Sequence, residues 1–343
     1  MSSEVIEHPI AREATVDSEL PARATASRTM RAGLVVLAPT LAGLAALAIH
    51  WLVPNRQSAL PANAYPVLLQ ILTAATVALA LIQWTWNPLR PWFRHYAPLM
   101  AGGFVWLSVW DLITLKMNWM PLPYFPGPGV VFQGMVDDRL MLLDSTYHSL
   151  KLLLTGYLAG VAVGVVSGVL LGWFGLIRYW GMPALKLVGP IPAALLIPLA
   201  MVLFSNAFLS AAALIAWSVW FPVTMLTSSG IANVPVSYLD VAKTLGAGRW
   251  YLIFRVAIPA ALPSIFVGVF MGLLVSFLAL CVAETVGVAS GLGWYVQWQR
   301  GYAEYGKVFG ALIIMGVFFS SLLSLLFRLR DRVLVWQKGV IQW

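Results

Sequence analysis

The sequence predicts an all-α, polytopic membrane protein with about eight transmembrane helices. Of its 343 residues, 60% are hydrophobic and only 10% are charged, whereas soluble domains carry about 25% charged residues. The apolar residues gather in runs of about 20, the length that an α-helix needs to cross the hydrocarbon core of a bilayer. The composition therefore excludes an ordinary soluble domain.

Eight apolar runs are long enough to span a membrane. The single cysteine, Cys281, excludes an internal disulfide and lies in an apolar run, where a buried thiol is expected. The formal net charge of +8 does not indicate nucleic-acid binding, because the basic residues are distributed among the segments between the runs. The eight runs cover about residues 31–53, 64–86, 97–115, 150–173, 185–204, 208–229, 262–285 and 308–328.

The N-terminal segment sets the expected topology. Residues 1–30 are polar and predict a disordered cytoplasmic tail. Arg28 and Arg31 precede the first run as in a secretory signal, but the run exceeds the roughly 7–15 residues of a signal core, so we interpret it as an uncleaved anchor. With the N-terminus inside, 15 of the 21 Lys and Arg residues fall on the cytoplasmic side. The positive-inside rule therefore predicts cytoplasmic N- and C-termini.

The longest outer connection covers about residues 116–149. Prolines at its start, from Pro121 to Pro128, prevent a helix there. Residues 130–142 then show apolar residues at helical spacing, which predicts a short amphipathic helix on the membrane surface. Just before this connection, Asp111 precedes Lys116 by five residues. An ion pair between them and an acid at the outer interface are both open interpretations.

A charged segment separates the sixth and seventh runs. Residues 237–264 are SYLDVAKTLGAGRWYLIFRVAIPAALPS. Ser237 and Asp240 have the spacing of a capping box, which predicts a helix start. Gly246 and Gly248 permit a sharp reversal, because glycine accepts positive φ. The product is a rigid helical hairpin, a shape suited to insertion into a groove of another protein.

Residues 240–259 of this segment resemble the cytoplasmic signature of the permease subunits of binding-protein-dependent ABC importers. That signature is Glu-Ala-Ala, three residues, Gly, nine residues, Ile, any residue and Leu-Pro. The departures here are conservative and the spacing is intact. The matching positions are Asp240, Val241, Ala242, Gly246, Val256, Ile258 and Pro259.

The resemblance implies that this stretch, with a coupling loop at 235–260, docks into a separate ATPase subunit. Gly246 would let the backbone turn against the ATPase surface. Lys243 and Arg249 would meet acidic groups there, and Leu245 completes the implied coupling set. The alternative is a loop that only reverses the chain, but most connections are far shorter than this one.

Further segments extend the resemblance to about residues 97–343. GPIPAALLIPLAMVLF and VAETVGVASGLGW are similar to the nitrate, sulfonate and taurine importer branch. The resemblance implies a six-helix permease domain over 97–343. The two additional N-terminal transmembrane helices expected within 31–96 fall outside the family pattern. The resemblance also implies an ATPase dimer that binds ATP and Mg²⁺, a second and preferably identical permease subunit, and an extracytoplasmic solute-binding protein. The complex would lie in the bacterial inner membrane, in contact with lipid.

Four further residues are candidates for the translocation pathway or its gate. Pro192 and Pro198 lie in the fifth run, where prolines free backbone carbonyls that can line a pathway, although a kinked, packed helix is equally compatible. Asn206 follows that run and is a candidate for the outer mouth. Glu284 ends the seventh run beside a Gly-rich loop. It is either a gate residue or an interfacial acid that contacts water or a backbone amide.

The chain has no phosphate-binding loop, because only one of its six lysines, Lys307, follows a glycine, and Val308 comes next. Either a partner hydrolyses ATP, or the chain is a secondary transporter driven by an ion gradient. Such carriers usually place ionisable groups near the midplane, whereas Asp111 and Glu284 lie near span ends. The four histidines lack metal-ligand spacing, so neither a metal site nor an enzyme is expected. We predict the permease subunit of an ATP-driven importer for a small anion.

Overall fold

The computed structural model describes residues 20–56, 63–120, 122–285 and 288–337. Within these ranges every regular element is helical. Seven helices are long and apolar enough to cross a membrane, and a bent helix pair brings the number to eight when it is counted as one span. The prediction of an all-α, multi-spanning protein is therefore confirmed. Residues 1–19 of the predicted tail lie outside the described residues, and the first helix begins at Leu20.

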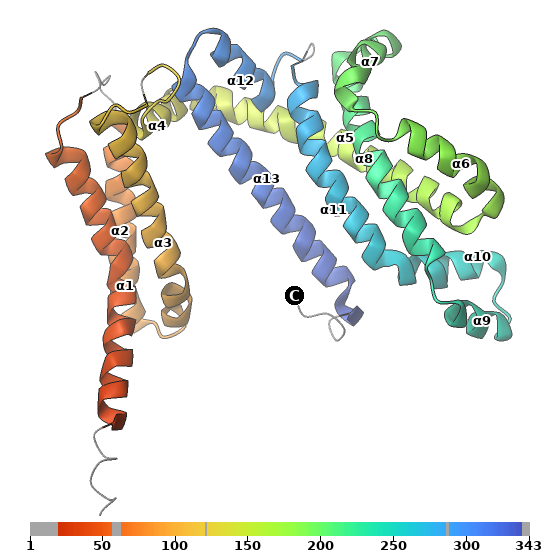
Figure 1. The fold of residues 1–343 in the computed structure, drawn as a ribbon, viewed down its shortest axis with the longest axis horizontal. Coiled ribbons are helices and arrows are strands. Elements are labelled where there is room, and N and C mark those ends of the chain that lie inside the picture. Colours follow the sequence, from red (N-terminus) through yellow and green to blue (C-terminus); the bar gives the residue numbers. More distant parts are fainter. Residues whose placement is uncertain (1–19, 57–62, 121, 286–287, 338–343) are drawn as a thin grey trace, which may run out of the picture. The chain divides into compact units, whose positions relative to one another are not determined.

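The chain divides into two compact units, residues 1–133 and 134–343. In the first unit, α1 packs against both α2 and α3 (Figure 1). The third span thus belongs to this N-terminal bundle, whereas the sequence analysis grouped it with the permease domain that begins at residue 97. The elements are α1 (Leu20–Leu52), α2 (Ala64–Thr85), α3 (Leu89–Asp111), the π-helical turn η1 (Leu112–Lys116) and α4 (Pro128–Asp137), which contains the boundary.

The second unit contains the remaining helices. Its long helices α5, α8, α11 and α13 carry the main core, and shorter elements join them (Figure 1). The elements are α5 (Arg139–Trp173), α6 (Gly175–Val188), η2 (Ala193–Leu196), α7 (Ile197–Leu203), α8 (Ala207–Ala232), α9 (Val236–Thr244), α10 (Arg249–Tyr251), η3 (Leu252–Ala257), α11 (Ile258–Ala283), α12 (Leu292–Gly301), α13 (Tyr305–Val333) and η4 (Val335–Gln337).

The most extensive helix contact in the second unit joins α5 and α8. Glycines recur at four-residue intervals on α5, so they lie along one face of the helix. A Cβ added at any of these glycines would lie 2.5–2.7 Å from an atom of α8. Their missing side chains let the two backbones approach closely, which is how helices gain packing energy in lipid. The glycines are Gly156, Gly160, Gly164, Gly168 and Gly172.

Candidate functional site

The segment between α8 and α11 forms a tight hairpin, which we call the α9–α10 hairpin (residues 235–260). The Gly246 and Ala247 amides donate to the carbonyls of Lys243 (2.9 Å) and Ala242 (3.0 Å), which closes the end of α9. Gly246 has φ +84°, the left-handed conformation that favours glycine. The reversal therefore falls at the residue that the sequence indicated. Gly248 has φ −73°, a conformation that other residues adopt as well, so the backbone does not require glycine at this position.

The predicted capping box is wrong. α9 begins at Val236 with Pro235 as its N-cap, and no side chain caps it. Ser237 therefore lies inside the first turn, where it cannot accept from the amides that a capping residue serves. Asp240 instead forms an exposed ion pair with Lys243, with Oδ1 and Nζ 3.2 Å apart.

The inner side of the hairpin is fixed to the second unit. Ala257 of η3 and Ile231 of α8 are buried in one core cluster, against which Leu239 of α9 packs. Leu252 and Ile253 are also buried. The hairpin is therefore anchored on both of its arms.

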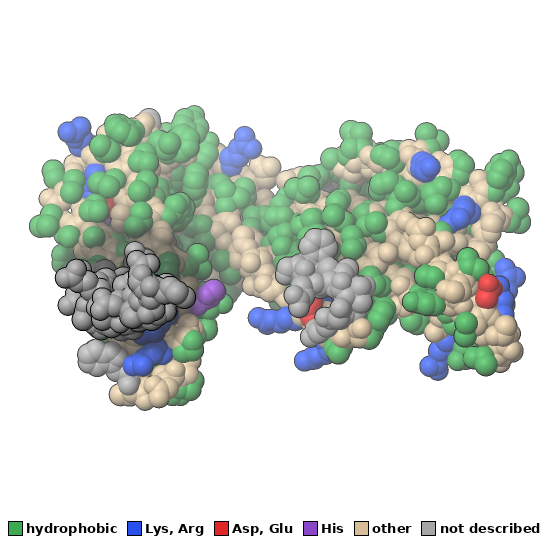
Figure 2. Space-filling model, turned by 60° about the horizontal axis from the view of Figure 1, so that its bottom comes forward, with side chains coloured by type: hydrophobic (Ala, Val, Ile, Leu, Met, Phe, Trp, Pro, Cys, Tyr) green, Lys and Arg blue, Asp and Glu red, His purple; other side chains and the backbone are tan. Residues whose placement is uncertain are grey.

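The outer side of the hairpin exposes large apolar side chains. Tyr238, Val241 and Leu245 are 57%, 61% and 83% exposed. Figure 2 looks onto this end of the second unit, where hydrophobic, basic and acidic side chains share the surface. The Arg249 guanidinium lies 4.5 Å from the Phe174 ring centroid, which orients its charge. The hairpin thus presents apolar anchors flanked by charges.

The remaining predicted coupling residues lie closer to the core. Ala242, Val256, Ile258 and Pro259 are all half-buried. They therefore shape and support the hairpin, while Val241, Leu245 and the charged residues form its surface.

The fifth span is not the continuous helix that the sequence analysis expected over residues 185–204. α6 ends at Val188, and the helical pair Gly175–Val188 and Ala193–Leu203 is bent by 90°. Pro192 is extended just before η2, and Pro198 lies in the first turn of α7. Pro192 thus lies at the break, where its missing amide cannot continue the helix, and Pro198 lies in the half that follows, at a position where a helix tolerates proline. The Ile191 carbonyl at the break accepts from Trp217 Nε1 at 3.4 Å.

Asn206 caps α8. Its side-chain oxygen accepts from the Phe208 amide at 2.8 Å, as N-cap residues do. This contact accounts for the residue type at this position, and a role at the mouth of a pathway stays a prediction.

Glu284 is fully buried at the C-terminal end of α11. Its Oε1 accepts from Ser149 Oγ of α5 and its Oε2 accepts from the Gly293 amide of α12, each at 2.5 Å. The contact with a backbone amide, which one of the two interpretations of this acid expected, is present, and the side chain is buried among protein groups. A role as a gate residue stays a prediction.

A second, half-buried polar cluster holds the middle and far end of α12. Asp138, at the start of α5, accepts from Tyr295 Oη at 2.7 Å and from Gln299 Nε2 at 3.2 Å, and its carboxylate lies 3.1 Å from Lys307 Nζ. Burial, followed by the bond to Asp138, raises the pKa of the Tyr295 phenol, which therefore remains a donor. No motif in the sequence predicts this cluster; its only local signal is the acid pair at 137–138 ahead of a long apolar helix.

In the first unit, Asp111 and Lys116 have different partners from those considered in the sequence analysis. Asp111 is 1% exposed and pairs with His50, with Oδ2 and Nδ1 3.0 Å apart. Lys116 Nζ donates to the carbonyls of His50 (2.6 Å) and Val53 (2.7 Å) and to Asn55 Oδ1 (2.6 Å). Asp111 is therefore paired with a histidine inside the protein and does not pair with Lys116. Lys116 satisfies carbonyls at the C-terminal end of α1, which have no partner within the helix.

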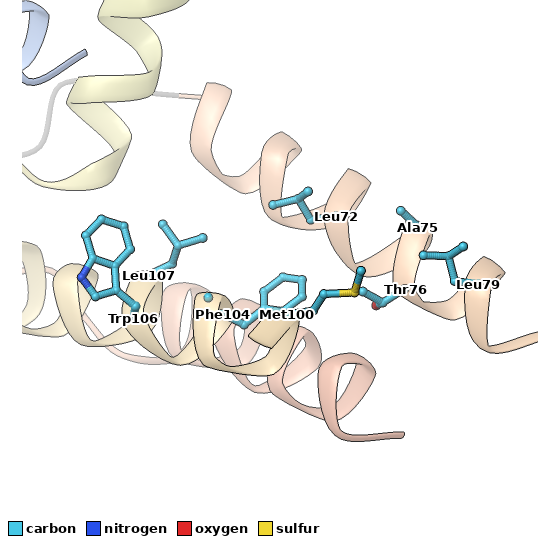
Figure 3. A pocket seen from close by; sticks show the side chains of 9 residues that line it. Leu72, Ala75, Thr76, Leu79, Met100, Phe104, Trp106 and Leu107 are labelled. Atoms are coloured by element: carbon cyan, nitrogen blue, oxygen red, sulfur yellow. The ribbon is translucent and has the colours of Figure 1, made fainter. Parts of the chain in front are cut away.

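An apolar pocket of about 360 Å³ lies between α2 and α3 (Figure 3). Among the described residues that line it, only Thr76 and Trp106 carry polar side-chain atoms, and the Thr76 hydroxyl donates to the Thr73 carbonyl at 2.8 Å. Solute sites usually combine an apolar lining with convergent polar groups. This pocket therefore lacks the groups that would orient a polar solute.

These features define a class of protein: a multi-pass helical membrane protein with a rigid, exposed hairpin between two long spans. The chain belongs to the family of binding-protein-dependent transport system inner membrane components, whose profile matches residues 160–335. The matched region includes the hairpin, α12 and most of the second unit, and it excludes the first unit.

Several known proteins are similar to this chain. It is 29% identical over 222 residues to a probable ABC transporter permease protein of Haemophilus influenzae, covering 65% of this chain and 90% of the relative. It is 31% identical over 184 residues to the putative aliphatic sulfonates transport permease protein SsuC of Bacillus subtilis, covering 54% and 67%. It is 27% identical over 270 residues to the taurine transport system permease protein TauC of Escherichia coli, covering 76% and 95%. A chain of the inward-facing MetNI methionine ABC transporter is 16% identical with a TM-score of 0.48, covering 60% of this chain and 99% of that one.

The chain is therefore a transmembrane permease subunit of an ABC importer, as the sequence predicted. Subunits of this family form the membrane channel and are not enzymes. Membership also implies an ATPase and a substrate-binding protein as partners, and a place in the inner membrane.

Proposed function

We propose that the α9–α10 hairpin is the coupling element through which this permease binds its ATPase. The observation that carries the proposal is the exposed apolar set of Tyr238, Val241 and Leu245 on a hairpin whose inner side is fixed to the core. Exposed apolar groups concentrated in this way mark an interaction surface. Asp240, Lys243 and the oriented Arg249 would add charge complementarity at its edge.

The proposed cycle follows from this attachment. The ATPase subunits bind ATP and Mg²⁺ and close, which displaces the hairpin. Because residues 249–283 form one helical stretch, α11 moves with the hairpin and the pathway opens alternately to the two sides. The hairpin and both termini lie in the cytoplasm in this arrangement, as the distribution of basic residues favours. Two copies of the chain form the pathway, to which the broken span at Pro192 and Pro198 contributes carbonyls.

The proposed substrate is a small anion of the sulfonate, taurine or nitrate kind. Two relatives are named for the transport of aliphatic sulfonates and of taurine. Both names describe compounds with a sulfonate group. A separate extracytoplasmic binding protein would select among such anions and deliver the substrate.

The test is co-purification from the native host in mild detergent, followed by mass spectrometry. The wild-type chain should recover an ATPase with a phosphate-binding loop. Gly246→Trp should lower the recovery at least about tenfold, or about 1.4 kcal/mol in affinity. A bulky residue there has a strained positive φ and no room in the docked complex. Leu245→Asp removes an apolar anchor without backbone strain and should have the same direction of effect.

Gly301→Trp is the matched control, because Gly301 also has open space around it but lies at the end of α12. It should retain the ATPase. Equal recovery from the wild type and both hairpin variants would refute the docking role. If no ATPase is recovered with any form, and uptake of labelled taurine or nitrate persists after ATP depletion, a gradient-driven carrier is the better description.

A further inference from the structure

The short helix α12 lies at the opposite end of α11 from the α9–α10 hairpin (Figure 1). The hairpin leads into α11 at Ile258, and α12 follows α11 after a connection that begins at Glu284. The helical stretch 249–283 has 35 residues, a length of about 50 Å at 1.5 Å per residue. One helix therefore joins the proposed ATPase contact to the far side of the membrane.

The N-terminus of α12 is bound to α5 and α11 by one carboxylate. Glu284 Oε2 accepts from the Gly293 amide, and Oε1 accepts from Ser149 Oγ. Ser149 Oγ in turn accepts from the Leu292 amide at 2.8 Å. The first two amides of α12, which have no partner within the helix, are thus both satisfied. The negative charge also suits the positive end of the helix dipole.

The surrounding backbone fits closely around this carboxylate. A Cβ at Gly291, which has φ +149°, would lie 2.6 Å from Glu284 Cδ, and a Cβ at Gly293 would lie 2.8 Å from Oε2. Glu284 itself has no exposed surface. The two glycines therefore permit an approach that no other residue type allows, and water has no access to the carboxylate.

The rest of α12 is held by the half-buried Asp138 cluster. Through Asp138, the side chains of Tyr295 and Gln299 are joined to the start of α5 and, through Lys307, to the start of α13. Phe277 and Cys281 of α11 also pack against the apolar cluster that contains Leu292 and Tyr295 of α12. Among the hydrogen bonds of the described residues, the one from the Gly293 amide to Glu284 Oε2 joins a side chain at the end of α11 to α12. Because apolar contacts are non-directional and this bond is directional, Glu284 is the group that fixes the N-terminus of α12 to α11.

We propose that Glu284 is a positioning residue that makes α12 move with α11, so that α12 acts as the outer gate of the pathway under control of the ATPase. The proposal rests on the proposed coupling role of the hairpin. A carboxylate is required because it has two acceptor oxygens, one for α5 and one for α12. A glutamine has only one acceptor oxygen. With that oxygen toward the Gly293 amide, the Ser149 hydroxyl loses its acceptor; with it toward Ser149, the glutamine NH2 group faces the Gly293 amide, and a buried unpaired polar group is costly.

The experiment uses the detergent-solubilised complex with its co-purified ATPase. Hydrogen exchange at the hairpin and at residues 292–301 is measured by mass spectrometry with no nucleotide and after trapping with ATP and vanadate. In the wild type, trapping should change exchange at both sites. In Glu284→Gln, trapping should still change exchange at the hairpin, but the change at α12 should be lost.

Two matched variants separate positioning from general destabilisation. Ser149→Ala removes the α5 hydroxyl from both Glu284 Oε1 and the Leu292 amide but leaves the bond from the Gly293 amide to Glu284. If that bond carries the movement, the response of α12 to trapping should persist. Asp144→Asn is a second acid-to-amide change in the second unit. Asp144 is exposed, accepts from Ser290 Oγ at 2.8 Å and lies 3.3 Å from His148 Nδ1; an asparagine oxygen can still accept from Ser290, and the variant should behave as the wild type.

The outcomes distinguish this inference from the proposed function. If the wild type recovers an ATPase but α12 of Glu284→Gln still responds to trapping, the role of Glu284 is refuted and the hairpin proposal stands. A wild type whose α12 does not respond while its hairpin does would also refute the gate. If the wild type recovers no ATPase, the proposed function itself fails.

Discussion

Replacing Gly164 by leucine is expected to prevent α5 from packing against α8. A Cβ at this position would lie 2.7 Å from both Cβ and Cγ1 of Val223, so even the first added carbon overlaps the facing helix. Overpacking usually costs about 1–3 kcal/mol, and more where the backbone has to move. Because Gly160 and Gly168 make equally close approaches on either side, the helices cannot separate at one point only. We expect a loss of monodisperse protein, or a fall in Tm of about 10 °C.

The matched control is Gly316→Leu in α13. Gly316 also lies inside a long helix, but no atom lies within 4 Å of its added Cβ. Leucine there should be tolerated, because it improves helix propensity by up to about 1 kcal/mol. Both variants are compared by fluorescence-detected gel filtration and thermal unfolding in detergent. Equal stability of the two variants would show that the glycine face of α5 does not set its distance from α8.

The structural features that were predictable from the sequence are those determined by residues close together along the chain. Each transmembrane span is defined by its own apolar run, and the reversal at Gly246 follows from glycines a few residues apart. Residues 240–259 match a family signature for the same reason, because all residues of this loop are consecutive in the sequence. The repeated glycines of α5 were equally local and visible, but their meaning depends on α8, which supplies the facing surface.

The fifth span shows the limit of a local pattern. Pro192 and Pro198 indicated a disturbed helix, and the break does occur between α6 and α7. The size of the bend, 90°, was not predictable. A proline removes a backbone hydrogen bond but does not determine the direction in which the chain continues. The direction of the chain after the break depends on partners from other helices, such as Trp217 of α8 at the Ile191 carbonyl.

Buried polar contacts were not predictable, because their members are far apart in the sequence. Glu284 and Ser149 are separated by 135 residues, and His50 and Asp111 by 61. Each residue taken alone resembles an acid or hydroxyl near a span end. Only the packing of α5, α11 and α12, or of α1 and α3, gives these side chains one environment without water and makes their pairing necessary.

Lys116→Met is expected to destabilise the first unit strongly. The ammonium group of Lys116, which is 3% exposed, supplies all three of its hydrogen bonds to the end of α1. Methionine fills a similar volume but leaves the His50 and Val53 carbonyls without this donor. It also removes the cation from a buried cluster in which Asp111 is bound to the His50 ring. Removing one partner from a buried charged group typically costs about 3–5 kcal/mol.

Hydrogen exchange at residues 47–56 and thermal unfolding in detergent measure this loss, with the exposed Lys151→Met in α5 as the control. The double variant Asp111→Asn/Lys116→Met identifies its cause. If the cost arises from an uncompensated carboxylate, the double variant should be more stable than Lys116→Met, since the two changes are coupled through His50. If it arises only from the carbonyls of α1, the second substitution should add its own cost. Wild-type exchange in Lys116→Met would refute both explanations, because the contacts of Lys116 would then contribute nothing to the end of α1.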